Sequence, residues 1–186
     1  MELNTAIFTR QSVSKVLADE VPRGLIEELL QAAAQAPNHH RVWPWRFVVL
    51  TGTARERMGE VMARSLLRRD PAASAAALEA ESKRPLRAPV LIAVGIDRPE
   101  SEKISEVENI CAGAAAVQNL LLAAHARGLG AVWRTGPAAV DTTLKEFLGF
   151  QPEQHLIAII YLGRMAGDPP AIDRPGFEDR TRWLDE

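Results

Sequence analysis

The stretch that decides the fold runs from Ser105 to Gly136 and reads SEVENICAGAAAVQNLLLAAHARGLGAVWRTG. Ser105 followed three residues later by Glu108 is a capping-box pattern. The serine hydroxyl accepts a first-turn N–H, and the carboxylate reaches back toward the positive end of the helix. We therefore expect a helix to begin here. Its apolar residues between 107 and 124 cover nearly the whole circumference, which is typical of a helix buried on most sides.

The same stretch predicts the end of this helix and a strand after it. His125 and Arg127 suit the negative end of a helix dipole, and Gly128 can adopt the left-handed conformation that stops a helix. The apolar run 131–133 is then a short buried strand. A core helix is therefore expected to lead into a strand whose end carries Trp133-Arg134-Thr135-Gly136.

Length and composition favour a single soluble domain spanning residues 1–186, with a cytoplasmic location. The net charge is -2 and the isoelectric point is about 6.1, so nucleic acid is not an expected partner. The N-terminus lacks the pattern of a secretion signal, and no window approaches the ~18 consecutive apolar residues of a membrane span. Cys111 is the only cysteine and lies within the apolar helix, which favours a structural thiol in a reducing compartment.

The remaining pattern predicts helices that alternate with at least four strands, an α+β arrangement with helices packed on a sheet. Thr53 with Glu56 resembles a second capping box, and Asp70-Pro71 is expected to start the helix after it; this Arg/Glu-rich pair is expected to be mostly solvated. The tail 164–186 is rich in proline and charge, which favours a loose end or an arm that grips a partner. The expected helices are 3–9, 22–36, 54–69, 71–83 and 140–148, and the expected strands are 46–50, 88–96, 131–134 and 156–162.

The common catalytic and cofactor motifs are absent from the sequence. There is no phosphate-binding loop of the Walker type, no GxSxG and no CxxC pair. Gly128-Leu129-Gly130 follows a helix and precedes a strand, the reverse of the order in the dinucleotide fingerprint. The adjacent His39 and His40 cannot both face one metal from a regular element, so no metal site is expected.

Two places could carry chemistry, and each has an alternative explanation. Arg10 and Ser12 follow a short helix, and one guanidinium with one hydroxyl could hold a phosphate. The alternative is a surface arginine beside a turn-forming serine. In the loop 37–45, Trp43 and Trp45 could belong to a site or could be core aromatic residues that cover the sheet edge.

Taken together, four short motifs resemble the nitroreductase family in content, order and spacing, over about residues 2–165. The likeness is greatest to its small bacterial NAD(P)H nitroreductases of the YdjA type. It implies a three-layer α/β/α sandwich with a mixed or antiparallel sheet, and a homodimer with FMN at the subunit interface, in which a strand or arm can be exchanged. The motifs are Arg10-Gln11-Ser12, Ala36-Pro37-Asn38-His39 with Pro44-Trp45, Gly130 to Gly136, and Tyr161-Leu162-Gly163.

The resemblance also implies roles for individual residues. Arg10 and Ser12 would hold the phosphate end of the flavin, with the backbone of Gln11 helping. Gln35 and His39 would reach the flavin bound mainly by the other subunit. Trp133, Arg134 and Thr135 would line the isoalloxazine, and an N–H near Thr135 or Gly136 would point at flavin N5, where a fixed donor stabilises the reduced form.

The implied activity is that of an FMN-dependent NAD(P)H oxidoreductase that passes hydride through flavin N5 to a nitroaromatic or quinone in a ping-pong sequence. No side-chain nucleophile is needed, which explains the absence of classical motifs. The family likeness also associates residues 123–128 with the pyridine nucleotide, either NADH or NADPH. Two alternatives stay open: a flavin-binding storage or sensor protein without turnover, and a flavin dehydrogenase or enone reductase of the same fold.

Two positions depart from the family pattern. Many nitroreductases have a basic residue two positions after the serine, where it meets flavin N1 and O2; here that residue is Ser14, with Lys15 next to it. Arg134 is a candidate to supply the missing charge. Trp43 stands where the family commonly has glutamine, and we expect its ring to pack on the sheet rather than narrow the substrate cleft.

Overall fold

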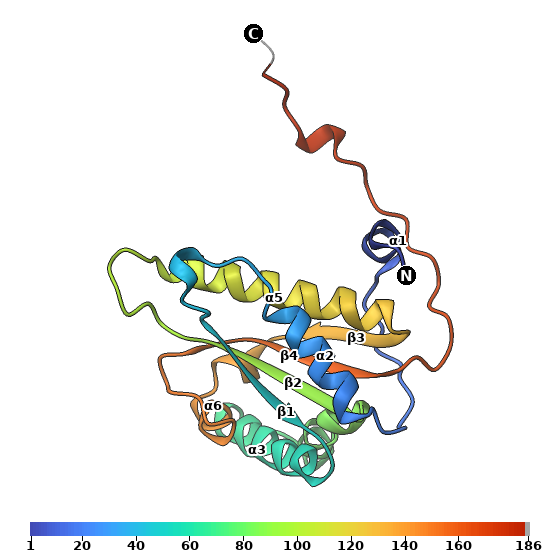
Figure 1. Cartoon of the computed structure of the whole chain (residues 1–186). Coiled ribbons are helices and arrows are strands. Elements are labelled where there is room, and N and C mark those ends of the chain that lie inside the picture. The colour runs from blue at the N-terminus through green and yellow to red at the C-terminus, as the bar shows by residue number, and fades with distance from the viewer. Residues whose placement is uncertain (185–186) are drawn as a thin grey trace.

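A four-stranded antiparallel sheet forms the middle layer of the protein (Figure 1). The structure is a computed structural model that describes residues 1–184, except for the side chain of Ala138. In the order β1-β2-β4-β3, the first and last of these strands form the two edges of the sheet. The strands are β1 (Trp45–Leu50), β2 (Val90–Ile96), β3 (Leu129–Arg134) and β4 (His155–Arg164).

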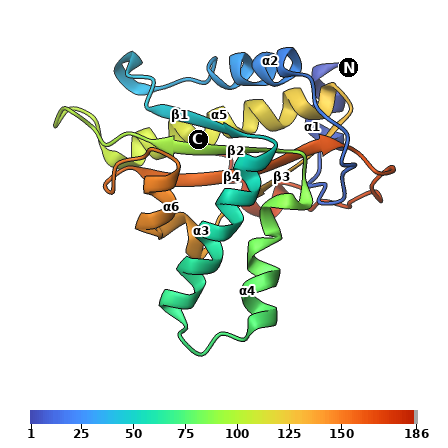
Figure 2. The same cartoon turned by 90° about the horizontal axis from the view of Figure 1, so that it is seen from below.

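Helices cover both faces of this sheet, so the predicted three-layer α/β/α architecture is confirmed (Figures 1 and 2). One layer holds α2 (Arg23–Ala33) and α5 (Glu106–Ala126), with α1 (Leu3–Thr9) against the end of α5. The other holds α3 (Thr53–Arg69), α4 (Ala75–Ser82) and α6 (Thr142–Phe147). Short 3-10 turns lie at His39–Arg41, Arg84–Arg87, Pro137–Val140 and Glu178–Arg180.

The alternation of side chains along the central strands produces two apolar cores. All seven residues of β2 are buried, which explains why its sequence is continuously apolar rather than alternating. Ile92 and Val94 face the core under α2 and α5, whereas Leu91 and Ala93 face the core under α3 and α6. Each large aliphatic side chain buried in this way contributes about 2 kcal/mol.

Helix α5 begins as predicted, with the Ser105 hydroxyl accepting the N–H of Glu108 and the Glu108 carboxylate accepting the N–H of Ser105. The sequence predicted a helix buried on most sides, but part of α5 is exposed. Val107 is 67% exposed and Cys111 is exposed as well, so the expectation of a thiol enclosed within the helix packing was wrong. By length and hydropathy α5 could cross a membrane, a test that core helices also meet, and here its inner face packs on the sheet and α2.

The predicted caps of two helices were wrong, although the helices exist and α3 begins within one residue of its predicted start. Gly52, with φ of 50°, precedes α3, and Thr53 makes no capping hydrogen bond. Asp70 does not start α4: it holds a turn, since its carboxylate accepts the N–H of Ala72. Ser74 caps α4 instead by accepting the N–H of Ala77. The error at Asp70 arises because a short polar residue can cap a helix or close a turn with the same hydrogen bond.

The pair α3 and α4 is largely exposed, as predicted, but one face of α3 is buried. Helix α3 buries Met58, Val61 and Met62 against the sheet. Gly59 lies so close to α4 that a Cβ there would come within 2.0 Å of the carbonyl oxygen of Ser82. The close approach of the two helices therefore requires glycine at this position.

We predict that Gly59→Ala lowers the free energy of unfolding by about 2 kcal/mol or more, because the added methyl group forces α3 away from the α4 backbone. Gly24→Ala is the matched control. Its Cβ would meet nothing within 4 Å, and alanine favours the helix, so a gain of about 0.5 kcal/mol is expected. Urea titration followed by circular dichroism measures both. Equal effects of the two substitutions would contradict the helix contact.

Candidate active site

The end of β3 provides exposed hydrogen-bond donors at the edge of the sheet. β3 pairs with β4 from Leu129 opposite Arg164 to Arg134 opposite Ile159, and the chain then leaves the ladder. Thr135 and Gly136 are exposed, and Gly136 has φ of 108°, a conformation that favours glycine. In the turn after β3, the described chain offers no backbone carbonyl to the N–H of either residue. Both N–H groups can therefore face a ligand.

Trp133 anchors this strand end. Its indole N–H donates to the carbonyl oxygen of Ile157 at 2.9 Å, and its half-buried ring packs on the core beneath α5. Because β3 side chains alternate, Arg134 then lies on the opposite face, with its guanidinium 5.7 Å from the centre of the Tyr161 ring. The strand end thus has an aromatic residue fixed on one face and a cation fixed on the other.

The segment with Arg10-Gln11-Ser12 lies beside the same strand. The N–H of Val13 donates to the carbonyl oxygen of Ala131 at 2.9 Å, which places the N-terminal segment along the free edge of β3. Thr135 comes four positions after Ala131, which corresponds to about 13 Å of extended chain. One extended ligand can therefore contact the N-terminal segment and the strand end together.

Near Arg10 the fold collects three basic side chains from distant parts of the sequence: Arg10, His125 and Arg174. Arg174 donates to the carbonyl oxygen of Ile7 at 3.4 Å and to that of Arg10, and the Gln11 amide donates to the carbonyl oxygen of Pro170 at 2.8 Å. These bonds hold the first part of the C-terminal tail over the end of α1. A cavity of about 380 Å³ lies beside them and is lined by His125, Arg174 and Asp168, although not by Arg10.

This basic cluster has the properties of an anion site. Burial lowers the pKa of Arg10, and the charge of Arg174 lowers it further. Burial also lowers the pKa of His125, with a smaller effect from Arg10, and the His125 ring hydrogen-bonds the Thr9 hydroxyl at 2.8 Å. Within residues 1–184 no carboxylate forms an ion pair with Arg10 or Arg174. A phosphate fits this donor set because it would relieve the repulsion between the cations.

Arg174 was not among the residues that the sequence pointed to. It lies in a tail without periodic pattern, and only the folded chain brings it to Arg10. The tail is therefore partly an element of the site. Its remaining described residues, 175–184, project away from the body in Figure 1, and residues 185–186 of the predicted arm lie outside the described chain.

Gln35 and His39 are not brought to Arg10 within one chain. His39 lies 3.6 Å from the Glu108 carboxylate, at the beginning of α5, whereas Arg10 lies by His125 at its end. These two positions on α5 are about 25 Å apart along the axis. Gln35 and His39 are both exposed, and within one chain they lie apart from Arg10.

The expectation that the Trp43 ring packs on the sheet was wrong. Its side chain is 55% exposed, and its backbone has φ of 44°, with its N–H donated to the Asn38 side chain at 2.9 Å. Trp45 is instead the tryptophan that packs in the core, with 6% exposure. The left-handed backbone at Trp43 turns its ring outward, away from the sheet. The bulky ring is thus available to a neighbouring molecule.

A second basic feature lies under the end of β3, on the face covered by α3. Four guanidinium groups, which we name the arginine pocket, surround a cavity of about 480 Å³ that Trp133 and Thr135 also line. Burial raises the pKa of the Tyr161 hydroxyl in this cavity, although the nearby arginines act in the opposite direction. The sequence pattern did not reveal this feature, because the arginine-rich α3–α4 region resembles a solvated surface. The four residues are Arg69, Arg84, Arg87 and Arg134.

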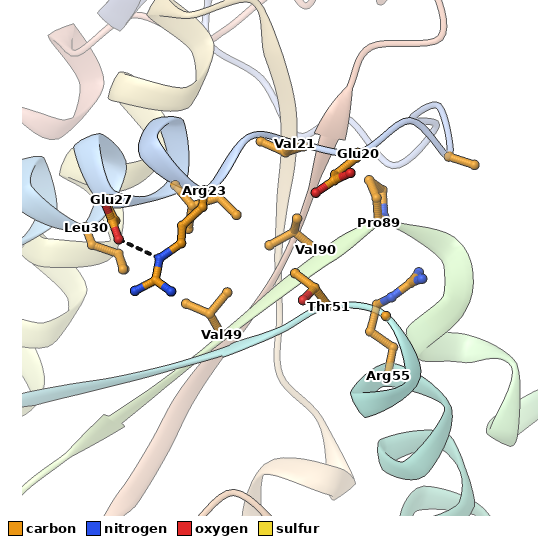
Figure 3. A pocket seen from close by; sticks show the side chains of 13 residues that line it. Glu20, Val21, Arg23, Glu27, Leu30, Val49, Thr51, Arg55, Pro89 and Val90 are labelled. Carbon is orange, nitrogen blue, oxygen red and sulfur yellow. Dashed lines mark hydrogen bonds and ion pairs between the residues drawn. The ribbon is translucent and has the colours of Figure 1, made fainter.

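A larger cavity of about 740 Å³ lies at the other edge of the sheet (Figure 3). It is lined by the start of α2, the end of β1 and Arg55, and the ion pair of Arg23 with Glu27 spans 2.7 Å at its rim. None of the predicted site residues lines it. Since β1 and β3 form opposite edges of the sheet, this cavity is separate from the candidate site.

Comparison with known proteins decides the family. The sequence model of the nitroreductase family matches residues 7–164, most of the chain. This chain belongs to the nitroreductase family. The match includes Arg10, His125 and the whole of β3, so every part of the candidate site except Arg174 falls inside the family region.

Curated relatives carry nitroreductase names. YdjA of Escherichia coli K12, named as a candidate NAD(P)H nitroreductase, is 29% identical over 164 residues, which are 88% of each chain. YfhC of Bacillus subtilis carries the same kind of name and is 27% identical, over 96% of this chain and 92% of its own length. The predicted resemblance to the YdjA type is therefore confirmed.

Solved structures confirm the nitroreductase fold. A nitroreductase-like protein from Bacillus cereus superposes with a TM-score of 0.89 at 25% identity, over 100% of this chain and 97% of the other. A candidate nitroreductase from Desulfovibrio desulfuricans, solved in complex with FMN, has a TM-score of 0.73 at 28% identity, over 94% and 92% of the two chains. FMN is thus bound by a relative with this fold.

We predict that Arg10→Gln raises the pKa of His125 toward the ordinary histidine value of about 6.5. The rise is incomplete because burial, the larger cause, remains. Since the folded pKa is depressed, folding releases protons below about pH 6.5, and stability falls as the pH drops through that range. The variant should therefore lose less stability on acidification than the wild type.

Nuclear magnetic resonance titration of the His125 ring proton measures this pKa directly. Arg57→Gln is the control, because Arg57 is exposed on α3, far from His125 in the sequence and outside the basic cluster. An unchanged His125 pKa in Arg10→Gln would show that the two side chains are not coupled.

Proposed function

We propose that this nitroreductase is an FMN-dependent NAD(P)H oxidoreductase that reduces small electron acceptors such as nitroaromatics or quinones. The observation that carries the proposal is the basic cluster of Arg10, His125 and Arg174, beside a strand end with available N–H groups. A phosphate and a flat heteroaromatic ring joined by a chain match these two parts. The FMN complex of the Desulfovibrio relative supports the choice of flavin.

In this proposal each group of the chain has one task. Arg10, Ser12 and Arg174 hold the phosphate, with Gln11 linking the site to the tail. Trp133 and Arg134 flank the ring, and the N–H groups of Thr135 and Gly136 face N5. These two N–H groups directly follow the last residue pair of the β3–β4 ladder, and the described chain gives them no backbone acceptor, so they are free to bind a ligand where charge develops.

FMN, when bound, would supply the redox chemistry between a reduced nicotinamide nucleotide and the acceptor in a ping-pong sequence. In this proposal the chain holds the flavin and the substrate in position and excludes water from around them. Residues 123–128 lie at the end of α5 and include His125 of the basic cluster. We propose that they contact the pyridine nucleotide. No nucleophilic side chain is required, which agrees with the absence of classical catalytic motifs.

We also propose a homodimer in which each site takes Gln35 and His39 from the second subunit. The exposed apolar stripe of α5, with Val107 and Cys111, supports an interface on that helix. The exposed Trp43 ring, on the same loop as His39, would meet the partner as well. The tail is proposed as the gripping arm, since Phe177 and Trp183 are 61% and 74% exposed.

We predict that Arg10→Glu lowers FMN affinity by at least about tenfold, because a charge-assisted hydrogen bond to phosphate contributes about 1.5–3 kcal/mol and repulsion replaces it. Arg174→Gln should give a smaller loss of the same kind. Fluorescence titration of FMN into the apoprotein measures both, with Arg57→Glu as the control. Wild-type protein that cannot be reconstituted with FMN would refute the proposed function.

Anaerobic addition of NADH and NADPH to the FMN-loaded protein tests turnover. Loss of the flavin absorbance near the visible maximum is expected with at least one nucleotide. Ser14, in place of the usual basic residue, favours one competing function, a flavin-binding protein that does not turn over. Such a protein would keep its colour with both nucleotides.

We predict that removal of residues 175–186 weakens the dimer and lowers FMN retention with it, because the arm would no longer bury its aromatic residues on the partner. Analytical ultracentrifugation at several concentrations measures the dimer dissociation constant. The double substitution Arg180→Gln, Arg182→Gln is the control, since it changes the charge of the tail and keeps its aromatic residues. An unchanged dimer after truncation would contradict the role of the arm.

A further inference from the structure

The arginine pocket is a built cavity next to the proposed flavin site, and binding of FMN does not account for most of its charge. Its apolar wall comes from Met62, Leu66 and Ile159. Its basic groups come from three separate elements: the end of α3, the 3-10 turn Arg84–Arg87, and the end of β3. Such convergence of cations on an apolar wall is unfavourable unless something negative binds among them.

Internal ion pairs neutralise only part of this charge. Arg69 lies 3.3 Å from the Asp141 carboxylate, and Arg84 lies 3.1 Å from the carboxylate of Glu81, whose side chain is 10% exposed. For Arg87 and Arg134, residues 1–184 provide no carboxylate within ion-pair distance. Arg87 and Arg134 therefore have no ion-pair partner among the described residues, and Glu81, the carboxylate that lines the cavity, is already paired with Arg84.

The positions of these groups are fixed by the fold. Arg134 lies over the Tyr161 ring, and its place on β3 is set by the pairing with Ile159. Arg84 and Arg87 flank the buried Pro85 in a turn that leads directly into the fully buried strand β2. The backbone positions of these cations are therefore set before a ligand binds.

We propose that the arginine pocket binds an anionic group, carboxylate or phosphate, of the small molecule that exchanges electrons at the end of β3. The inference rests on the proposed function and names the class of its substrate. Planar guanidinium groups pair with carboxylate and phosphate oxygens in two-pronged fashion, and the cavity of about 480 Å³ has room for a small aromatic acid. Because Trp133 and Thr135 line it, an anion held here keeps the rest of the molecule beside the proposed flavin ring.

The test compares a charged acceptor with a neutral one of the same size. The FMN-loaded protein is assayed with 4-nitrobenzoate and with 4-nitrobenzamide, and the ratio of the two kcat/KM values is measured in the wild type and in Arg87→Gln. Arg87 is chosen because it makes none of the ion pairs found among the described residues, so its loss leaves no buried charge. We expect the ratio to fall about tenfold in Arg87→Gln and to stay unchanged in Arg57→Gln.

The anion could instead belong to the nucleotide. Rates of flavin bleaching by NADPH and by NADH are therefore compared in the same variants. If Arg87→Gln slows flavin bleaching by NADPH but not by NADH, the pocket is assigned to the nucleotide phosphate. If it lowers kcat/KM for 4-nitrobenzoate but not for 4-nitrobenzamide, the pocket is assigned to the acceptor. Titration of the loaded protein with 4-nitrobenzoate, followed by the flavin difference spectrum, should show the same weakening in Arg87→Gln without turnover.

Three results would overturn the inference. One is equal loss of activity with charged and neutral substrates, which would mean that Arg87 is only structural. Another is an Arg87→Gln variant whose activity is unchanged with every substrate. The third is loss of FMN itself from Arg87→Gln with unchanged substrate ratios, which would assign the pocket to the cofactor. In each case the proposed function still stands if the wild-type protein binds FMN and NADH or NADPH bleaches the bound flavin.

Discussion

The pairing of β3 with β4 is the constraint on which the candidate site depends. It fixes the point at which the chain leaves the sheet, and with it the direction of Trp133, Arg134 and the two N–H groups after them. The pairing is itself held by α5, whose capped beginning and left-handed stop at Gly128 deliver β3 to its place. An error of one residue in this register would exchange the tryptophan and arginine faces.

Basic groups without matching carboxylates occur on both sides of this strand. Arg10, His125 and Arg174 gather beside its free edge, and the arginine pocket lies under its end. Clusters of like charge oppose folding, and they are therefore informative about ligands when the described chain does not neutralise them. In both places the simplest compensating group is an anion carried by a small molecule. The protein thus has one basic region beside the N-terminal segment and another under the end of β3.

The sequence predicted the helices and strands better than it predicted which side chains lie on the surface and which of them come together. The capping box at Ser105, the stop at Gly128 and all four strands follow from local patterns, because backbone hydrogen bonding and side-chain alternation are local. Arg174 and Arg87 could not be found in this way, since their roles arise from contacts between distant segments. Trp43 was placed wrongly because an apolar ring usually packs inside, whereas a left-handed backbone turns this one outward.

The most direct test of the account is a crystal structure of the protein grown with FMN. We expect the phosphate within hydrogen-bonding distance of Arg10 and Arg174, the ring against Trp133, and N5 facing the N–H of Thr135 or Gly136. Gln35 and His39 should reach this ring from a second subunit. A flavin bound instead in the cavity at the β1 edge, or enclosed by one subunit alone, would contradict the account.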